Sequence, residues 1–171
     1  MAENLLGAQR AGPYLDGMER RQLRFDRYED VLQEAERLAA AGYDRVGNWG
    51  LGQACEHLAT VMGMSLDGFP GRMPWPVRLA ARWLVMKRLL RHEVFRRRVP
   101  APSFLRPKDS LDDRAALERL RAAVTRLQAH QGEMKPSPIF GRLTPEEWRE
   151  IHLWHCEHHF SFLLPKAAAA G

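Results

Sequence analysis

The chain has 171 residues, about the length of a single domain, since domains typically span roughly 100–200 residues. Hydrophobic residues make up 45% of the chain and charged residues 27%, which excludes intrinsic disorder for most of it. Every apolar stretch meets a charge before the ~18 residues that a membrane-spanning helix needs. Two cysteines indicate a reducing compartment, and we expect a cytoplasmic protein.

The first half of the chain predicts an irregular arm followed by two helices. Residues 1–19 contain several glycines and no apolar periodicity, so we expect no regular structure there. Apolar residues then recur at steps of three and four over 27–41, and Gly42 follows as a stop signal. A glycine-rich turn at 47–50 leads into a second predicted helix over 51–66.

A third predicted helix is strongly basic. Pro74 and Pro76 are suited to its first turn, and it reaches about Phe95. Nine cationic residues lie in 71–100 against Glu93 alone, which gives this segment a net charge of +8. Because the whole chain carries +5, the remainder carries −3. The positive charge is therefore concentrated in one helix and the residues that follow it.

Three interpretations of the basic helix, 72–98, remain open. Basic residues that flank an apolar face are typical of a helix that docks on an anionic membrane, and a charge asymmetry of this kind also suits a nucleic acid. Alternatively, the apolar stripe packs on the domain while solvated arginines cover apolar surface with their stems. A third interpretation is a positive rim that attracts an acidic small substrate.

Two further helices are predicted in the second half of the chain. Prolines in 100–107 predict a connector, after which Ser110 is the expected N-cap of a helix that stops at Gly132. The stretch 144–147 combines threonine, proline and glutamate in a capping box, which starts a final helix that runs to about Leu164.

These elements predict an all-α fold, because no strand-type alternation extends over more than a few residues. We expect a four-helix bundle over 20–166 as a single domain, with the basic helix added in the long crossover between the second and third bundle helices. Residues 167–171 form a short alanine-rich tail.

Histidines on two predicted helices carry the clearest chemical signal. His155 and His159 are four residues apart, so they share the inward apolar face of the last helix. His57 lies on the inward face of the second helix. Three neutral imidazoles from facing helices can hold a divalent ion, with one position open for water or substrate. The alternative is that each histidine is a hydrogen-bonded core residue.

Other polar residues near these histidines are weaker candidates. His152 and His158 lie at the two edges of the same helix face, where either could act as a catalytic base or orient a ligand. Glu157 is rotated away from that face. Cys55 and Cys156 do not share the ligand face either, and we expect both to be small buried hydrophobes.

Several short segments resemble the DinB-like superfamily. Two segments of the chain are similar to the second-helix signature of this superfamily: Asn-Trp-Gly-Leu-Gly-Gln at 48–53 and Glu-His-Leu-Ala at 56–59. The pair His155 and His159 is similar to the histidine pair near the C-terminus of its members. Three further segments, 20–25, 138–143 and 162–165, resemble an uncharacterised bacterial subfamily. The whole likeness covers about residues 20–165.

The resemblance implies a four-helix bundle of up-down-down-up topology. It also implies a site for zinc, or for nickel or iron, with His57, His155 and His159 as ligands. Members often form homodimers, and characterised relatives include transferases and isomerases that use low-molecular-weight thiols such as bacillithiol or mycothiol. The sequence departs from the superfamily at 160–162, where Phe-Ser-Phe replaces a Gly-Gln step found in many members.

Two functions follow as predictions. The first is a metal-dependent enzyme that acts on a small-molecule substrate. It would be an S-transferase, in which the ion activates a low-molecular-weight thiol, or a hydrolase, in which the ion activates water. The second is a non-catalytic bundle that binds an anionic membrane or nucleic acid through the basic helix 72–98.

Overall fold

The computed structural model describes residues 20–90 and 103–166. The expected arm at 1–19, the tail at 167–171 and the end of the third helix beyond Leu90 lie outside these residues. The elements of the described part are α1 (Tyr28–Ala41), β1 (Tyr43–Arg45), α2 (Leu51–Asp67), α3 (Trp75–Leu90), the short 3-10 helix η1 (Ser103–Leu105), α4 (Asp113–Ala129), α5 (Pro145–Phe160) and β2 (Leu163–Pro165).

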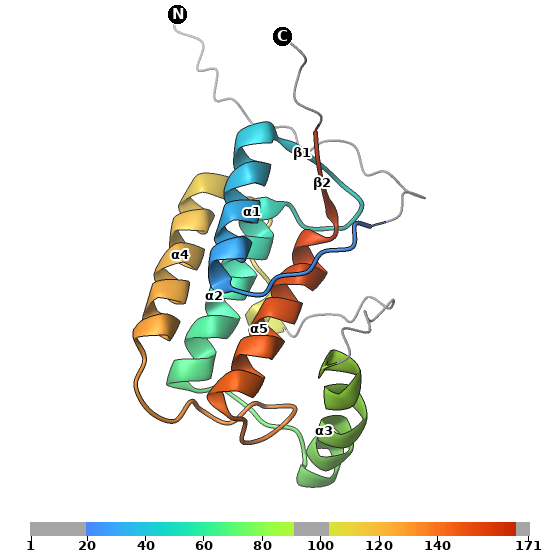
Figure 1. The fold of residues 1–171 in the computed structure, drawn as a ribbon, viewed down its shortest axis with the longest axis vertical. Helices are drawn as coiled ribbons and strands as arrows, with labels where there is room; N and C mark the ends of the chain where they lie inside the picture. Colours follow the sequence, from blue (N-terminus) through green and yellow to red (C-terminus); the bar gives the residue numbers. More distant parts are fainter. Residues whose placement is uncertain (1–19, 91–102, 167–171) are drawn as a thin grey trace, which may run out of the picture.

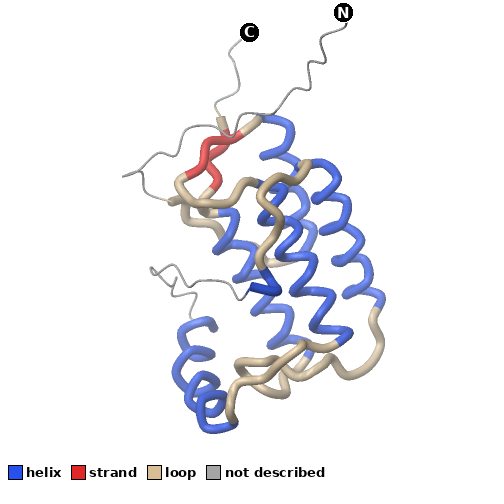
Figure 2. Tube along the Cα trace, turned by 180° about the vertical axis from the view of Figure 1, so that it is seen from behind, coloured by secondary structure: helices blue, strands red, loops and turns tan. Residues whose placement is uncertain are grey.

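Helices α1, α2, α4 and α5 lie side by side, and α3 stands next to α5 (Figures 1 and 2). In Figure 1, α1 and α5 run upward along the chain, whereas α2 and α4 run downward. Helix α2 packs most extensively against α4, and it also contacts α5 and α1. The described part of the chain is mostly helical, with one pair of short strands, which agrees with the expected all-α class.

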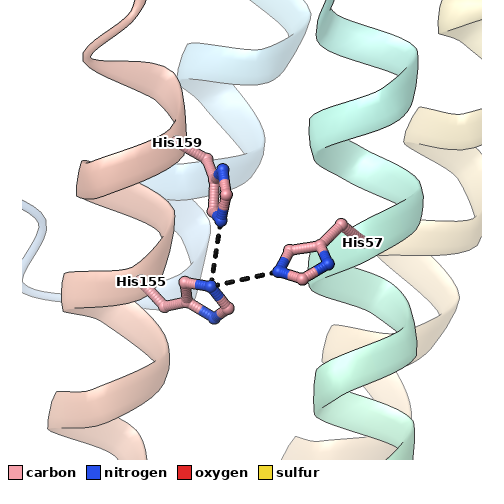
Figure 3. A group of neighbouring side chains, drawn as sticks. All are labelled: His57, His155 and His159. Atoms are coloured by element: carbon pink, nitrogen blue, oxygen red, sulfur yellow. Dashed lines mark hydrogen bonds between the residues drawn. The ribbon is translucent and has the colours of Figure 1, made fainter. Parts of the chain in front are cut away.

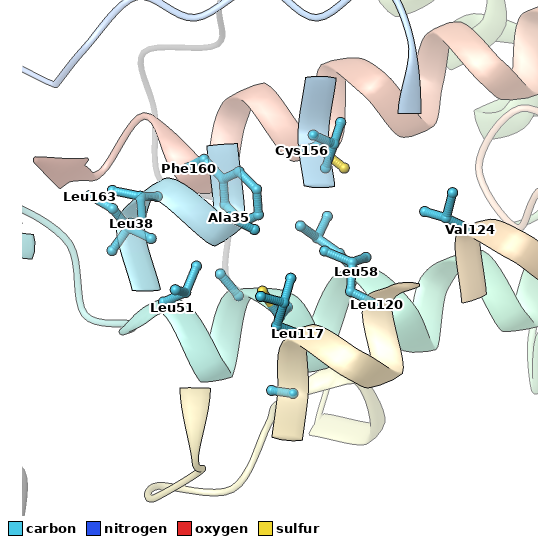
Figure 4. Packing of buried hydrophobic residues seen from close by; sticks show 14 of the residues in the cluster. Ala35, Leu38, Leu51, Leu58, Leu117, Leu120, Val124, Cys156, Phe160 and Leu163 are labelled. Carbon is cyan, nitrogen blue, oxygen red and sulfur yellow. The ribbon is translucent and has the colours of Figure 1, made fainter. Parts of the chain in front are cut away.

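A single apolar cluster joins these four helices (Figure 4). Leu58 of α2, Leu120 of α4 and Phe160 of α5 are almost completely buried in it. Burial of a large apolar side chain stabilises the folded state by about 1.5–3 kcal/mol. Cys55 and Cys156 are free thiols in this cluster, and burial raises the pKa of both, which confirms the prediction that they act as small hydrophobes.

The start of α5 is as predicted, and the start of α4 is not. The Thr144 hydroxyl accepts a hydrogen bond from the Glu147 backbone N–H at 3.1 Å, and the Glu147 carboxylate accepts one from the Thr144 N–H at 3.0 Å. For α4 the N-cap is Asp112, whose carboxylate accepts from the Ala115 N–H at 2.7 Å. The expected N-cap Ser110 lies two residues too early, because the helix begins only at Asp113.

The sequence did not predict the antiparallel pair of β1 and β2, in which Tyr43 is opposite Pro165 and Arg45 is opposite Leu163. Strands of three residues are too short to show alternation in the sequence. Their pairing also explains why α5 ends at Phe160 rather than near Leu164, since the last residues are extended. The pair ties the end of α5 to the segment that precedes α2.

Helix α4 ends at Ala129 rather than at the expected Gly132. Gly132 lies in the loop that follows the helix and has a positive φ of 126°.

Among the residues that the structure describes, no helix combines the length and the apolar character that crossing a membrane requires.

Candidate metal centre

Helices α2 and α5 bring the three predicted ligand residues together (Figure 3). The Nε2 atom of His155 lies 3.2 Å from Nε2 of His57 and 3.0 Å from Nε2 of His159. One ring nitrogen from each residue lies within 4.8 Å of the other two. His155 and His159 are one helical turn apart on α5 and point toward α2, and His57 points back toward them.

The backbone fixes which nitrogen of His57 is available. Its Nδ1–H donates a hydrogen bond of 2.8 Å to the carbonyl oxygen of Leu105 in η1. A carbonyl can only accept, so Nδ1 carries the proton and the neutral ring directs the lone pair of Nε2 toward α5. Sequence reasoning missed this contact, because a backbone carbonyl 48 positions away leaves no residue-type signal.

The three nitrogens cannot all be satisfied by hydrogen bonds among themselves. A ring nitrogen has one in-plane direction, which holds either one proton or one lone pair. Nε2 of His155 faces both other Nε2 atoms, so it can form a good hydrogen bond with only one of them. A cation among the three nitrogens would bind all the lone pairs at once. Two nitrogens bound tetrahedrally to zinc lie ~3.3 Å apart, close to both contacts.

All three imidazoles are held in the neutral form that metal ligation needs. Burial lowers the pKa of His57, although the Leu105 carbonyl opposes this effect. Burial, and then the neighbouring imidazoles, lower the pKa of His155 and His159 well below the ordinary range. Neutral rings at neutral pH keep their lone pairs free for a ligand ion.

Trp49 packs against two of the three rings. Its ring is stacked on His159, with centroids 5.1 Å apart and an interplanar angle of 13°, and its centroid lies 4.9 Å from that of His57. In the sequence, Trp49 stands out only as part of the segment 48–53. The geometry shows that it restricts the rotation of two imidazoles.

His152 lies deeper in the protein. It is 1% exposed, its Nδ1 is 3.0 Å from the Tyr28 hydroxyl of α1, and its ring stacks on Trp148. In the described part of the chain its Nε2 has no hydrogen-bond partner. Burial lowers its pKa to about 3, so the ring is neutral. Its contacts therefore join α5 to α1, and no described hydrogen bond links it to the three-histidine group.

His158 borders the three-histidine group. Its ring meets that of His159 edge-on at 5.1 Å and stacks on Trp154 at 5.9 Å. Burial and then the positive charge of Arg20 lower its pKa to about 4. Its Nδ1 is buried without a hydrogen-bond partner among the described residues. Glu157 points away, as expected, since its carboxylate accepts from the Phe25 N–H at 2.8 Å.

The fold and this site define a mostly helical protein with a three-histidine cluster able to hold a metal ion. The chain belongs to DUF1569, a protein family of unknown function, whose family model matches residues 17–166. No curated protein and no solved structure matches the chain.

Proposed function

We propose that this protein is a divalent-metal-binding protein of the DinB-like type, with His57, His155 and His159 as ligands. The observation that carries the proposal is the convergence of three ring nitrogens. Nε2 of His155 lies 3.0 Å from Nε2 of His159 and 3.2 Å from Nε2 of His57. Zinc suits this set of neutral imidazoles, and nickel and iron take the same ligands. When bound, such an ion lowers the pKa of a coordinated thiol or water and so supplies a nucleophile near neutral pH.

The arrangement of the helices supports the DinB-like assignment. Helices α1, α2, α4 and α5 share one core, and their directions in Figure 1 follow an up-down-down-up order. The basic helix α3 lies in the connection between α2 and α4, as expected for a helix added in the crossover. In this proposal residues 20–166 form one four-helix-bundle domain, with its ligands on the second and last helices.

As an enzyme, the protein would be a metal-dependent transferase that uses a low-molecular-weight thiol, or a hydrolase. Of the two weak catalytic candidates, His158 is better placed than His152, because its ring touches that of His159. A neutral imidazole at this position can accept a proton from a bound thiol or water. His152 instead contacts the Tyr28 hydroxyl of α1 and so connects α5 to α1.

The decisive experiment is elemental analysis of protein purified without an affinity tag. We expect about one divalent ion per chain in the parent and almost none in the double variant His155→Ala/His159→Ala. His152→Gln is the matched control, since it alters a buried histidine of the same helix and should keep the ion. An equal metal content in the parent and the double variant, with folding intact, would contradict the proposal.

The reaction class is tested separately on the zinc-loaded protein. It is incubated with a low-molecular-weight thiol and an electrophilic acceptor, or with an activated ester alone. Turnover that requires zinc and falls in His158→Gln supports the enzyme. A loaded protein that turns over neither kind of substrate would leave the metal site standing and remove the thiol-transferase and hydrolase assignments.

A further inference from the structure

Helix α3 presents large apolar side chains to solvent around more than half of its circumference. We define the outer face of α3 as five side chains that are each about half exposed or more: Trp75 (70%), Val77 (47%), Leu79 (61%), Trp83 (65%) and Leu84 (58%). Five large apolar side chains on one surface helix exceed the scattered single exposures that are usual in a globular protein.

Two arginines of this helix, Arg78 and Arg82, are only partly exposed. Arg82 donates to the Arg142 carbonyl at 2.7 Å and forms an ion pair with Glu147 at 3.0 Å. On the same side, Met86 is buried and Ala81 packs against a second apolar cluster, which contains Trp148 of α5. The inner side of α3 therefore packs on the domain, as one interpretation of the sequence expected, while the five side chains defined above stay exposed.

The apolar surface continues beyond the helix. The Met73 N–H donates to the Pro138 carbonyl at 3.0 Å, which holds the entry of α3 against the loop that follows α4. Met73 is 47% exposed and Ile139, next to that carbonyl, is 41% exposed. The outer face of α3 and these two side chains therefore form a surface made by two distant segments of the chain.

We propose that this surface docks on an anionic lipid bilayer, with α3 lying along the interface. Trp, Leu and Val side chains suit the boundary between headgroups and acyl chains, where an amphipathic helix buries its apolar face. Among the residues that the structure describes, the stretch 71–90 that contains α3 has five cationic residues and no acidic one, a net charge of +5. Each cation near an anionic membrane strengthens binding about fivefold, so the charge complements phosphatidylserine.

The charge and the side-chain types favour a bilayer over other occupants. A second copy of the chain would bring two stretches of net charge +5, residues 71–90 of each copy, together. A nucleic acid would also be attracted by this charge, but it offers no apolar layer into which five aliphatic and aromatic side chains could insert. The surface is also independent of the metal proposal, since the three histidines lie between α2 and α5.

Vesicle co-sedimentation tests the proposal on the full chain. Vesicles of phosphatidylcholine and phosphatidylserine in equal parts should bind the parent, and vesicles of phosphatidylcholine alone should bind it far more weakly. Trp75→Ser/Leu79→Ser should weaken binding at least tenfold, because two apolar side chains no longer enter the interface. Phe104→Ser is the matched control: Phe104 is 51% exposed but belongs to η1, which packs against α2.

A second readout separates insertion from simple charge attraction. Lipids with brominated acyl chains quench tryptophan that reaches them, so they should quench the parent bound to anionic vesicles. Trp75→Phe/Trp83→Phe should still sediment with the vesicles but lose most of this quenching. Bound parent that is not quenched at all would overturn the insertion of α3.

Three other results would also overturn the proposal. The first is no binding to anionic vesicles at low salt, where electrostatic attraction is strongest. The second is equal binding by the parent and Trp75→Ser/Leu79→Ser. The third is that the surface binds something other than vesicles. The protein would then retain an RNA oligonucleotide, or it would form a dimer that Trp75→Ser/Leu79→Ser dissociates, while vesicles do not bind.

Discussion

The two interfaces of α2 differ in kind. Toward α4, Leu58 and Leu120 are buried in the shared apolar cluster. At its start this interface is closed by the Asp113 carboxylate, which accepts from the Gly52 N–H at 2.8 Å. Toward α5, the same helix contributes His57 to three imidazoles whose facing nitrogens cannot all be satisfied by one another. The first arrangement stabilises the fold, and the second reduces stability unless something binds there.

Gly52 shows how closely the α2–α4 interface is fitted. A Cβ atom at this position would lie 2.9 Å from the Asp113 carboxylate and 3.0 Å from the Leu111 carbonyl oxygen. Only glycine allows the two helix starts to approach this far. Toward α5, in contrast, His57 meets the imidazole side chains of His155 and His159.

The largest expected effect separates the two interfaces directly. Leu58→Ala should lower the free energy of unfolding by about 2–5 kcal/mol, because it opens a cavity among the buried side chains. The metal content of the folded variant should stay that of the parent. Urea denaturation and elemental analysis on the same preparation measure both quantities. Loss of the ion together with stability would show that the two interfaces are not separable.

Removal of the metal should act on the other interface alone. With zinc at about 100–1,000 times its dissociation constant, a chelator should lower the unfolding free energy of the parent by about 3–4 kcal/mol. His57→Ala should show no such response, since it lacks one of the three ligands. Thermal unfolding with and without chelator measures this difference, and an equal shift in both proteins would contradict the site.

Trp49 allows a finer test of the same interface. Trp49→Leu frees two imidazoles to rotate, so zinc affinity should fall about 10–100-fold, as is typical when a residue that supports a metal ligand is removed. Competition with a chromophoric chelator gives the dissociation constant. Trp75→Leu, on the outer face of α3, is the matched control and should leave zinc affinity unchanged.

Over a single pH unit, the smallest expected effect is that of acid on the buried His152. The pKa of His152 falls from its ordinary 6.5 to about 3 on folding, so between these values the unfolded chain binds a proton that the folded chain does not. Its contribution to stability is complete above pH 6.5 and is lost as the pH falls, by about 1.4 kcal/mol per pH unit. Urea titrations with chelator present should show a shallower loss for His152→Gln than for the parent.

His130→Gln is the control for that substitution, because His130 is exposed at the end of α4. It should retain the acid sensitivity of the parent. An unchanged pH profile in His152→Gln would mean that the buried ring of His152 is not responsible.

The sequence allowed the helices and the three histidines to be predicted because both signals are local. Apolar periodicity placed α1 and α2 within one residue of their ends, and the four-residue spacing put His155 and His159 on one face. Contacts made by the backbone left no such signal. The Leu105 carbonyl on His57 and the pairing of β1 with β2 depend on chain segments that meet only in the folded protein.

The orientation of α3 could not be predicted for a different reason. Its sequence contains apolar and basic residues on most sides, so periodicity alone does not say which face turns inward. The outcome depends on partners on other elements, namely the Glu147 carboxylate and the Arg142 carbonyl, both of which hold Arg82.

The separation of the histidines along the chain has a consequence for the order of assembly. His57 and His155 are 98 residues apart, and both remaining ligands lie within the last turns of the final helix. A growing chain therefore carries only one of the three imidazoles until α5 is made and docks beside α2. The proposed site is thus completed last during synthesis, and metal loading would report that the entire domain has folded.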